Sequence, residues 1–117
     1  MHELGIANQI LELLKSEAEK RDARVTGVTL TIGKMSGIMP DSLVFLLETI
    51  SKGTACEGMK IDFSLEETRL ECKSCSHSFV TSDFDFRCPK CKSGDCVIIS
   101  GKDLVIDKIG LEVPDGA

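Results

Sequence analysis

Two Cys-x-x-Cys pairs constrain this chain more than any other feature of its sequence. The pairs are Cys72 with Cys75 and Cys88 with Cys91, and twelve residues separate them. A turn of this spacing directs two thiolates at one ion, and Zn²⁺ takes four such soft ligands in structural sites. The pattern therefore predicts a tetrahedral four-cysteine zinc site. The segment that carries it has few apolar residues, so metal binding is expected to hold it folded.

Other cysteine chemistry fits the pattern less well. A redox Cys-x-x-Cys centre places one pair at a helix start after a strand, whereas these pairs flank a short loop. A disulfide framework would require export, and no apolar leader opens the sequence. A four-cysteine iron–sulfur site uses the same ligands and stays open as an alternative. His77 follows Cys75 by two residues. We interpret it as a loop residue or one that contacts the ligands, since four thiolates already satisfy zinc. The alternative is that His77 coordinates metal or couples the two sites, especially at mildly acidic pH when a thiolate is lost.

The composition indicates a globular protein. With 117 residues, of which 42% are hydrophobic and 28% charged, the chain is expected to form one domain that carries a small insert. It has no apolar run long enough to span a bilayer, so we expect a cytoplasmic protein without a membrane partner. The net charge of −5 provides no general attraction to nucleic acid, and basic residues near the cysteines are interpreted as compensation for thiolate charge. We expect no nucleic-acid partner, and a monomer or a weak homodimer in solution.

Apolar periodicity predicts two helices and four strands. Apolar residues recur at helical spacing over residues 4–20 and again from Pro40 to about Gly53. Pro40, Asp41 and Ser42 carry the signals of a helix start. Alternation of apolar and polar residues predicts strands at residues 28–32, 60–65, 96–100 and 104–113.

The order of these elements predicts the α+β class, with two helices packed on a small β-sheet. The strand at residues 104–113 has no partner of matching length near the cysteines, so we expect it to pair with the earlier strands. The cysteine segment would then be a zinc-ribbon-like subdomain inserted between two strands of one domain. We place this insert at residues 70–97 and the surrounding domain at residues 1–69 and 98–117.

The amino terminus, Met1-His2-Glu3, is the second candidate metal site. An α-amine, the following backbone amide and the His2 side chain can close fused five- and six-membered chelate rings around one ion. Met1 and Glu3 would contribute backbone groups, and Glu3 also has a carboxylate. Nitrogen-rich, planar donor sets suit Ni²⁺ or Cu²⁺ better than Zn²⁺. On this chemistry alone, the alternative that His2 is only an exposed polar residue stays open.

Three segments and the paired cysteines together carry a resemblance to a known family. The segments are MHELGIA at residues 1–7, GKMSGIMPDSL at residues 33–43 and GTACEG at residues 53–58. With these motifs the sequence resembles the HypA/HybF family, the nickel metallochaperones of NiFe-hydrogenase maturation. The resemblance implies a protein that is not an enzyme, with His2 as the nickel ligand, assisted by the backbone around Glu3, and structural zinc on the four cysteines. It also implies three partners: a HypB-type GTPase, the hydrogenase large-subunit precursor and, in some bacteria, urease maturation proteins.

A different class of function stays open beside this one. In it the chain is a zinc-ribbon interaction module without transferable metal, and the terminal histidine is incidental. A metal assay separates the two classes. The chaperone predicts one tight site for Zn²⁺ and one labile site for Ni²⁺, whereas the interaction module predicts zinc alone.

Overall fold

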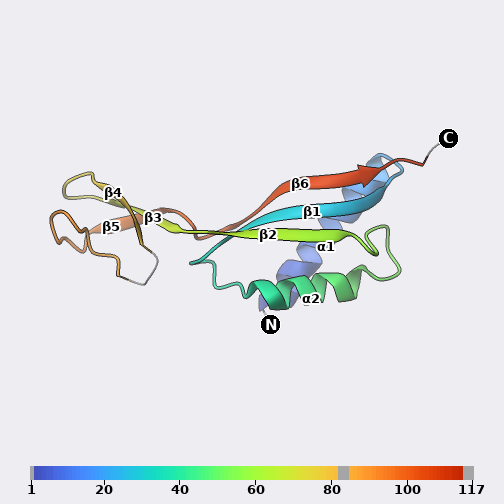
Figure 1. Cartoon of the computed structure of the whole chain (residues 1–117), viewed down its shortest axis with the longest axis horizontal. Coiled ribbons are helices and arrows are strands. Elements are labelled where there is room, and N and C mark those ends of the chain that lie inside the picture. The colour runs from blue at the N-terminus through green and yellow to red at the C-terminus, as the bar shows by residue number, and fades with distance from the viewer. Residues whose placement is uncertain (1, 82–84, 115–117) are drawn as a thin grey trace. The chain divides into compact units, whose positions relative to one another are not determined.

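A computed structural model describes residues 2–81 and 85–114, with side chains from Glu3 onward (Figure 1). Its elements, in chain order, are α1 (His2–Lys20), β1 (Arg24–Gly33), α2 (Pro40–Ser51), β2 (Lys60–Glu66), β3 (Thr68–Cys72), β4 (Ser78–Thr81), β5 (Cys96–Ser100) and β6 (Leu104–Glu112). Both predicted helices and all four predicted strands are present, which confirms the α+β class. The first strand is longer than predicted, because β1 begins at Arg24 rather than at residue 28.

The chain forms two compact units. The first consists of Met1–Leu30, Ile38–Phe63 and Val105–Ala117, and the second of Thr31–Gly37 and Ser64–Leu104. Both helices belong to the first unit, and both cysteine pairs belong to the second. The predicted domain boundaries at residues 70 and 97 stay a prediction.

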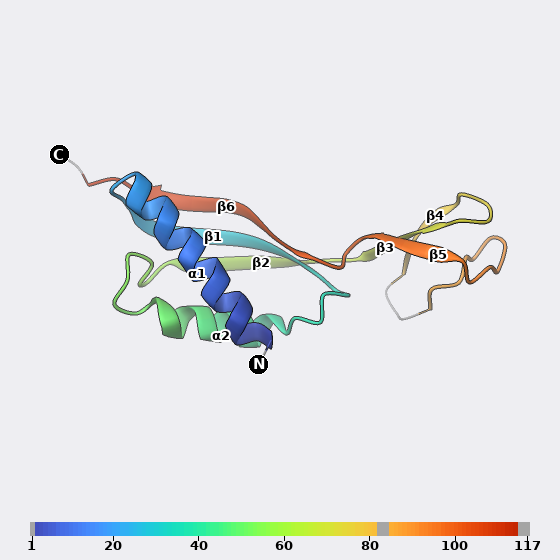
Figure 2. The ribbon, with the colours of Figure 1, turned by 180° about the vertical axis from the view of Figure 1, so that it is seen from behind.

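The first unit packs its helices against a three-stranded sheet of order β2-β1-β6. Figures 1 and 2 show α1 crossing one face of this sheet, with α2 beside it. Four leucines from α1, β1 and α2 are fully buried in this unit: Leu14, Leu30, Leu43 and Leu47. Each contributes about 1.5–3 kcal/mol relative to an exposed side chain. The pairing of β6 with β1 confirms the prediction that the last strand joins the earlier ones. Over the described residues, no helix is long and apolar enough to cross a membrane.

The second unit contains a three-stranded antiparallel sheet of order β4-β3-β5. Leu70 of β3 lies opposite Phe79 of β4 and Ile98 of β5. The sequence patterns predict β5 but neither β3 nor β4. The missed signal is the alternation that buries Thr68, Leu70 and Cys72 along β3. The alternation is easily overlooked, because it is complete only when Cys72, a predicted metal ligand, is also counted as a buried strand residue.

A break at Glu67 separates β2 from β3, although the sequence suggests one run from residue 60 towards Cys72. The two strands belong to different sheets. Gly101 approaches this break closely: its φ is +90°, and a Cβ atom there would overlap the backbone carbonyl of Glu67. Only glycine meets both conditions without strain.

Backbone hydrogen bonds anchor the start of the loop that follows β1. The amide of Lys34 donates to the carbonyl of Glu66 at 2.9 Å, and the amide of Met35 donates to the carbonyl of Gly101 at 2.9 Å. The Lys34 ammonium also pairs with the Glu67 carboxylate at 2.5 Å. These bonds make the start of the loop a fixed part of the second unit.

Candidate metal centres

The structure brings the four predicted cysteine ligands into one cluster in the second unit. Their sulfur atoms all lie within 4.8 Å of one another, and the side chains that the structure describes form no other group of three or more candidate metal ligands. The Sγ atoms of Cys72 and Cys91 are 3.5 Å apart, and those of Cys75 and Cys88 are 3.7 Å apart. Four sulfurs bonded to Zn²⁺ at about 2.3 Å would lie about 3.8 Å from one another. The donor set therefore fits one tetrahedral ion and leaves no room for a cluster of several irons.

Two turns with the same backbone pattern carry the cysteines. In each turn, the amide four residues after the first cysteine donates to the carbonyl of that cysteine: Ser76 to Cys72 at 2.9 Å and Lys92 to Cys88 at 2.8 Å. Both donors adopt a left-handed backbone, with φ of 64° for Ser76 and 67° for Lys92. The amide of each first cysteine in turn donates to a carbonyl five residues ahead at 2.9 Å. The repeated turn directs two sulfurs from each pair into the cluster.

Hydrogen bonding distributes the protons of the cluster unequally. Burial raises the pKa of Cys72, but hydrogen bonds from the Cys75 backbone amide and the Cys91 thiol outweigh it and lower this pKa to about 6. A hydrogen bond from the Ser93 amide lowers the pKa of Cys91. The hydrogen bond to Cys72 and burial outweigh this effect and raise the pKa of Cys91 to about 12. The two thiols of this pair therefore differ in how readily they lose their protons. A metal ion must displace such protons, so its affinity for the cluster falls as the pH falls.

The field of the cluster extends to a fifth cysteine. Burial, followed by the charge and hydrogen bonding of Cys72, raises the pKa of Cys96. Cys96 is half-buried at the start of β5 and is not among the four clustered ligands. From the sequence, Cys96 is interpreted as a free thiol that packs near the cysteine loop, because it belongs to no Cys-x-x-Cys pair.

His77 contacts the cluster through its backbone. Its carbonyl accepts the Cys72 amide at 2.9 Å. Its ring stacks on Phe79, with ring centroids 6.0 Å apart and an angle of 16° between the planes. Within the described part of the chain, His77 does not join the group of candidate ligands. The alternative role predicted for His77, coupling of the two metal sites, stays a prediction.

The second candidate site, at the amino terminus, is only partly described. Met1 and the side chain of His2 lie outside the described residues, and the backbone of His2 begins α1. The side chain of Glu3 is described: its Oε2 accepts a hydrogen bond from the Met39 amide at 3.2 Å. The sequence does not predict this contact, since 36 residues separate its two partners.

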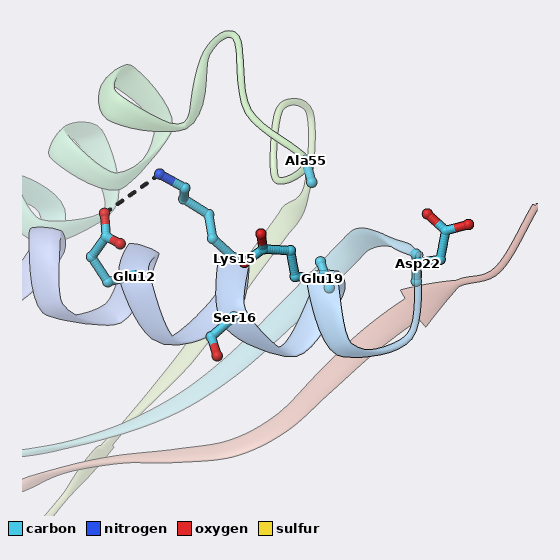
Figure 3. Close-up of a pocket in the computed structure, with 8 residues that line it drawn as sticks. Glu12, Lys15, Ser16, Glu19, Asp22 and Ala55 are labelled. Atoms are coloured by element: carbon cyan, nitrogen blue, oxygen red, sulfur yellow. Dashed lines mark hydrogen bonds and ion pairs between the residues drawn. The ribbon is translucent and has the colours of Figure 1, made fainter.

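A cavity of about 550 Å³ lies elsewhere in the first unit, between α1 and the segment that contains Ala55. Figure 3 shows its polar lining, which includes the ion pair between Lys15 and Glu12 at 3.4 Å. Its carboxylates form no group able to hold a metal ion in the part of the chain that the structure describes. The cavity therefore does not compete with the four cysteines as a metal centre.

Comparisons with known proteins agree with the fold. The profile of the family described as "Hydrogenase/urease nickel incorporation, metallochaperone, hypA" matches residues 1–111. The hydrogenase maturation factor HypA of Desulfatibacillum aliphaticivorans is 39% identical, over 98% of this chain and 90% of that protein. The factor HypA of Caldanaerobacter subterraneus is 36% identical, over 96% of this chain and 100% of that protein. The solution structure of the Ni metallochaperone HypA from Helicobacter pylori matches with a TM-score of 0.70 and 26% identity, over 96% of this chain and 98% of that one.

The fold and the comparisons together define the class of protein as a metallochaperone, which carries a metal ion rather than catalysing a reaction. The family profile spans nearly the whole chain, and the two relatives exceed 30% identity over almost all of it. The chain belongs to the HypA family of hydrogenase and urease nickel-incorporation proteins.

Proposed function

We propose that the protein binds Ni²⁺ at its amino terminus and delivers it during the maturation of NiFe-hydrogenase. The observation that carries this proposal is the family match, which begins at residue 1 and so includes the Met1-His2-Glu3 sequence. The His2 imidazole is the principal ligand, and Met1 and Glu3 contribute backbone groups. Such a nitrogen-rich set suits Ni²⁺.

The position of these residues at a helix start supports coordination through the backbone. The amides of the first turn of a helix have no carbonyl partner within that helix, and α1 begins at His2. Coordination through the amides of His2 and Glu3 would therefore break no hydrogen bond of the helix. The Glu3 carboxylate already accepts the Met39 amide, which favours the backbone of Glu3 as its contribution to the nickel site.

The four cysteines hold a structural Zn²⁺ in this proposal. Four thiolates close the coordination sphere, so this ion stabilises the fold and is not the one transferred. In small finger peptides, structural zinc contributes about 10–16 kcal/mol at neutral pH. The second unit needs this contribution, because its fully buried apolar side chains among the described residues are few: Ile32, Leu70, Cys72 and Cys88.

The proposed partners are those that the resemblance to the family implies. A terminal site with open coordination positions exchanges ligands more readily than a closed four-thiolate site. The protein receives or passes on nickel together with a HypB-type GTPase. It delivers the nickel to the hydrogenase large-subunit precursor, in the cytoplasm. The family description includes urease, which supports urease maturation proteins as further partners. The protein itself acts as a monomer or a weak homodimer.

Nickel titration of the untagged, zinc-loaded protein tests this proposal. Calorimetry is expected to find one nickel site in the unaltered chain. His2→Ala, or one alanine added before Met1, should weaken nickel binding at least tenfold and leave the zinc content unchanged. His77→Ala is the matched control, because it removes the other histidine of the chain. Unchanged nickel binding in His2→Ala would place the site elsewhere, and zinc alone in the unaltered protein would favour an interaction module.

A further inference from the structure

Two serines join the cysteine turns to each other without the use of any ligand sulfur. Ser74 lies within the first turn, and Ser93 lies just after the second cysteine pair. Their Oγ atoms are 3.1 Å apart, and either hydroxyl can donate the hydrogen bond. The two serines are 19 residues apart in the chain. Their contact therefore exists only when the two turns have come together.

Backbone hydrogen bonds close a ring around this contact. The Oγ atom of Ser93 also accepts the amide of Asp95 at 3.1 Å. The carbonyl of Asp95 accepts the amide of Lys73 at 2.8 Å, and Lys73 is the chain neighbour of Ser74. The carbonyl of Ser93 accepts the amide of Cys88 at 2.9 Å, which holds this serine to the second turn. The ring thus links the first turn to the second independently of a metal ion.

The ring belongs to the half of the cluster that faces solvent. Cys75 and Cys91 are the two exposed ligands, whereas the other two are buried. Ser74 directly precedes Cys75, and Ser93 lies two residues beyond Cys91. An incoming ligand reaches the exposed thiolates first, and it bonds to the ion as the Zn–S bonds to them break. Because these two thiolates come from different turns, separation of the turns assists release of the ion.

We propose that Ser74 and Ser93 form a clasp that positions the two turns and slows the loss of the structural ion. Neither serine is a ligand, so both act as positioning residues. A neutral hydrogen bond contributes modestly, and the clasp therefore changes the rate of release severalfold while the ion remains the main stabiliser of the second unit. The inference rests on the zinc site proposed above and is independent of nickel binding.

Zinc transfer from the zinc-loaded full chain to a chromophoric chelator tests the clasp. The rate is measured for the unaltered chain, Ser74→Ala, Ser93→Ala and the double variant. Each single variant is expected to release zinc at least about threefold faster, since a hydrogen bond between the turns is lost. The double variant should match Ser93→Ala, because the bond that the two serines share is lost only once. Unaltered rates in the single variants, or effects that multiply in the double variant, would overturn the clasp.

Two further variants show whether the serine hydroxyl itself is responsible. Ser93→Thr retains a hydroxyl and should release zinc within about twofold of the unaltered rate. Release as fast as in Ser93→Ala would overturn the proposal. Ser78→Ala is the matched control, because it removes an exposed hydroxyl of β4 that takes no part in the ring, and its rate should be unaltered. An unaltered chain that holds no zinc would instead overturn the zinc site itself.

Discussion

The Oε2 atom of Glu3 accepts a hydrogen bond from the backbone amide of Met39 at 3.2 Å. Met39 is the residue immediately before α2, at the N-cap position. No side-chain hydrogen bond caps the start of that helix. The contact joins the first turn of α1, where the nickel site is proposed, to the start of α2 within the first unit. The conformation of the amino terminus therefore depends on a residue far along the chain.

Loss of this hydrogen bond should be measurable. Glu3→Ala is expected to lower the free energy of unfolding by about 1 kcal/mol, since the bond has a charged acceptor but is exposed to solvent. Glu3→Gln retains an acceptor oxygen and should cost less. Amide hydrogen exchange at Met39 measures the contact directly, and it should accelerate in Glu3→Ala alone. An unaltered exchange rate at Met39 in that variant would show that the contact does not protect this amide in solution.

Alanine at position 101 should destabilise the second unit. Gly101→Ala would force a side chain into the left-handed region, at about 1–2 kcal/mol, and would drive its Cβ into the Glu67 carbonyl. We expect a loss of at least about 2 kcal/mol in the free energy of unfolding, measured by denaturant titration. Gly94→Ala is the matched control: its Cβ would meet no atom within 4 Å, and its effect should stay within about 0.5 kcal/mol. Similar losses in the two variants would contradict the close approach at Gly101.

The ion pairs of Glu17 predict a small pH dependence of stability. Its carboxylate accepts hydrogen bonds from Lys20 at 3.1 Å and Arg21 at 3.2 Å. Both bonds lower the pKa of Glu17 from the usual 4.5, and the bond from Lys20 has the larger effect. A carboxyl with a lower pKa in the folded state stabilises the fold above the unfolded pKa, and this contribution is lost as the pH falls through the folded pKa. Glu17→Gln should therefore lower the melting temperature slightly at neutral pH, but not at about pH 2.

Two controls separate this effect from other consequences of the substitution. Glu19→Gln removes a neighbouring carboxylate of α1 and is expected to change the melting temperature less at neutral pH. Added salt should reduce the Glu17→Gln difference, because the ion pairs are exposed and screened. A difference that persists at low pH would show that packing rather than charge is responsible.

Removal of the metal should affect the two units unequally. Chelation is expected to unfold the second unit, whose buried apolar side chains are few, and to leave α1 and α2 intact on their leucine core. Circular dichroism should retain the helical signal, while amide protection is lost along β3 and β5. Simultaneous loss of the helices would show that the two units unfold together. Acidification should release the metal as well, since its ligands must be deprotonated.

Much of the fold and the zinc cluster could be predicted from local patterns. Helical spacing of apolar residues is a property of neighbouring residues, so it predicts both helices without knowledge of their partners. The spacing within Cys72–Cys75 and Cys88–Cys91 likewise sets where each turn directs its sulfurs. The Met1-His2-Glu3 donors are also contiguous, although their site lies largely outside the described residues.

The sequence by itself determined the two helices, the four strands with clear alternation, the four clustered cysteines and the family. The tertiary structure alone decided three further features. It divided the run from residue 60 to Cys72 between two sheets, set Cys96 opposite Cys72, and joined Glu3 to Met39. The physical reason is that these features depend on strand register and on packing between distant segments, and no local periodicity encodes which distant residue becomes a neighbour.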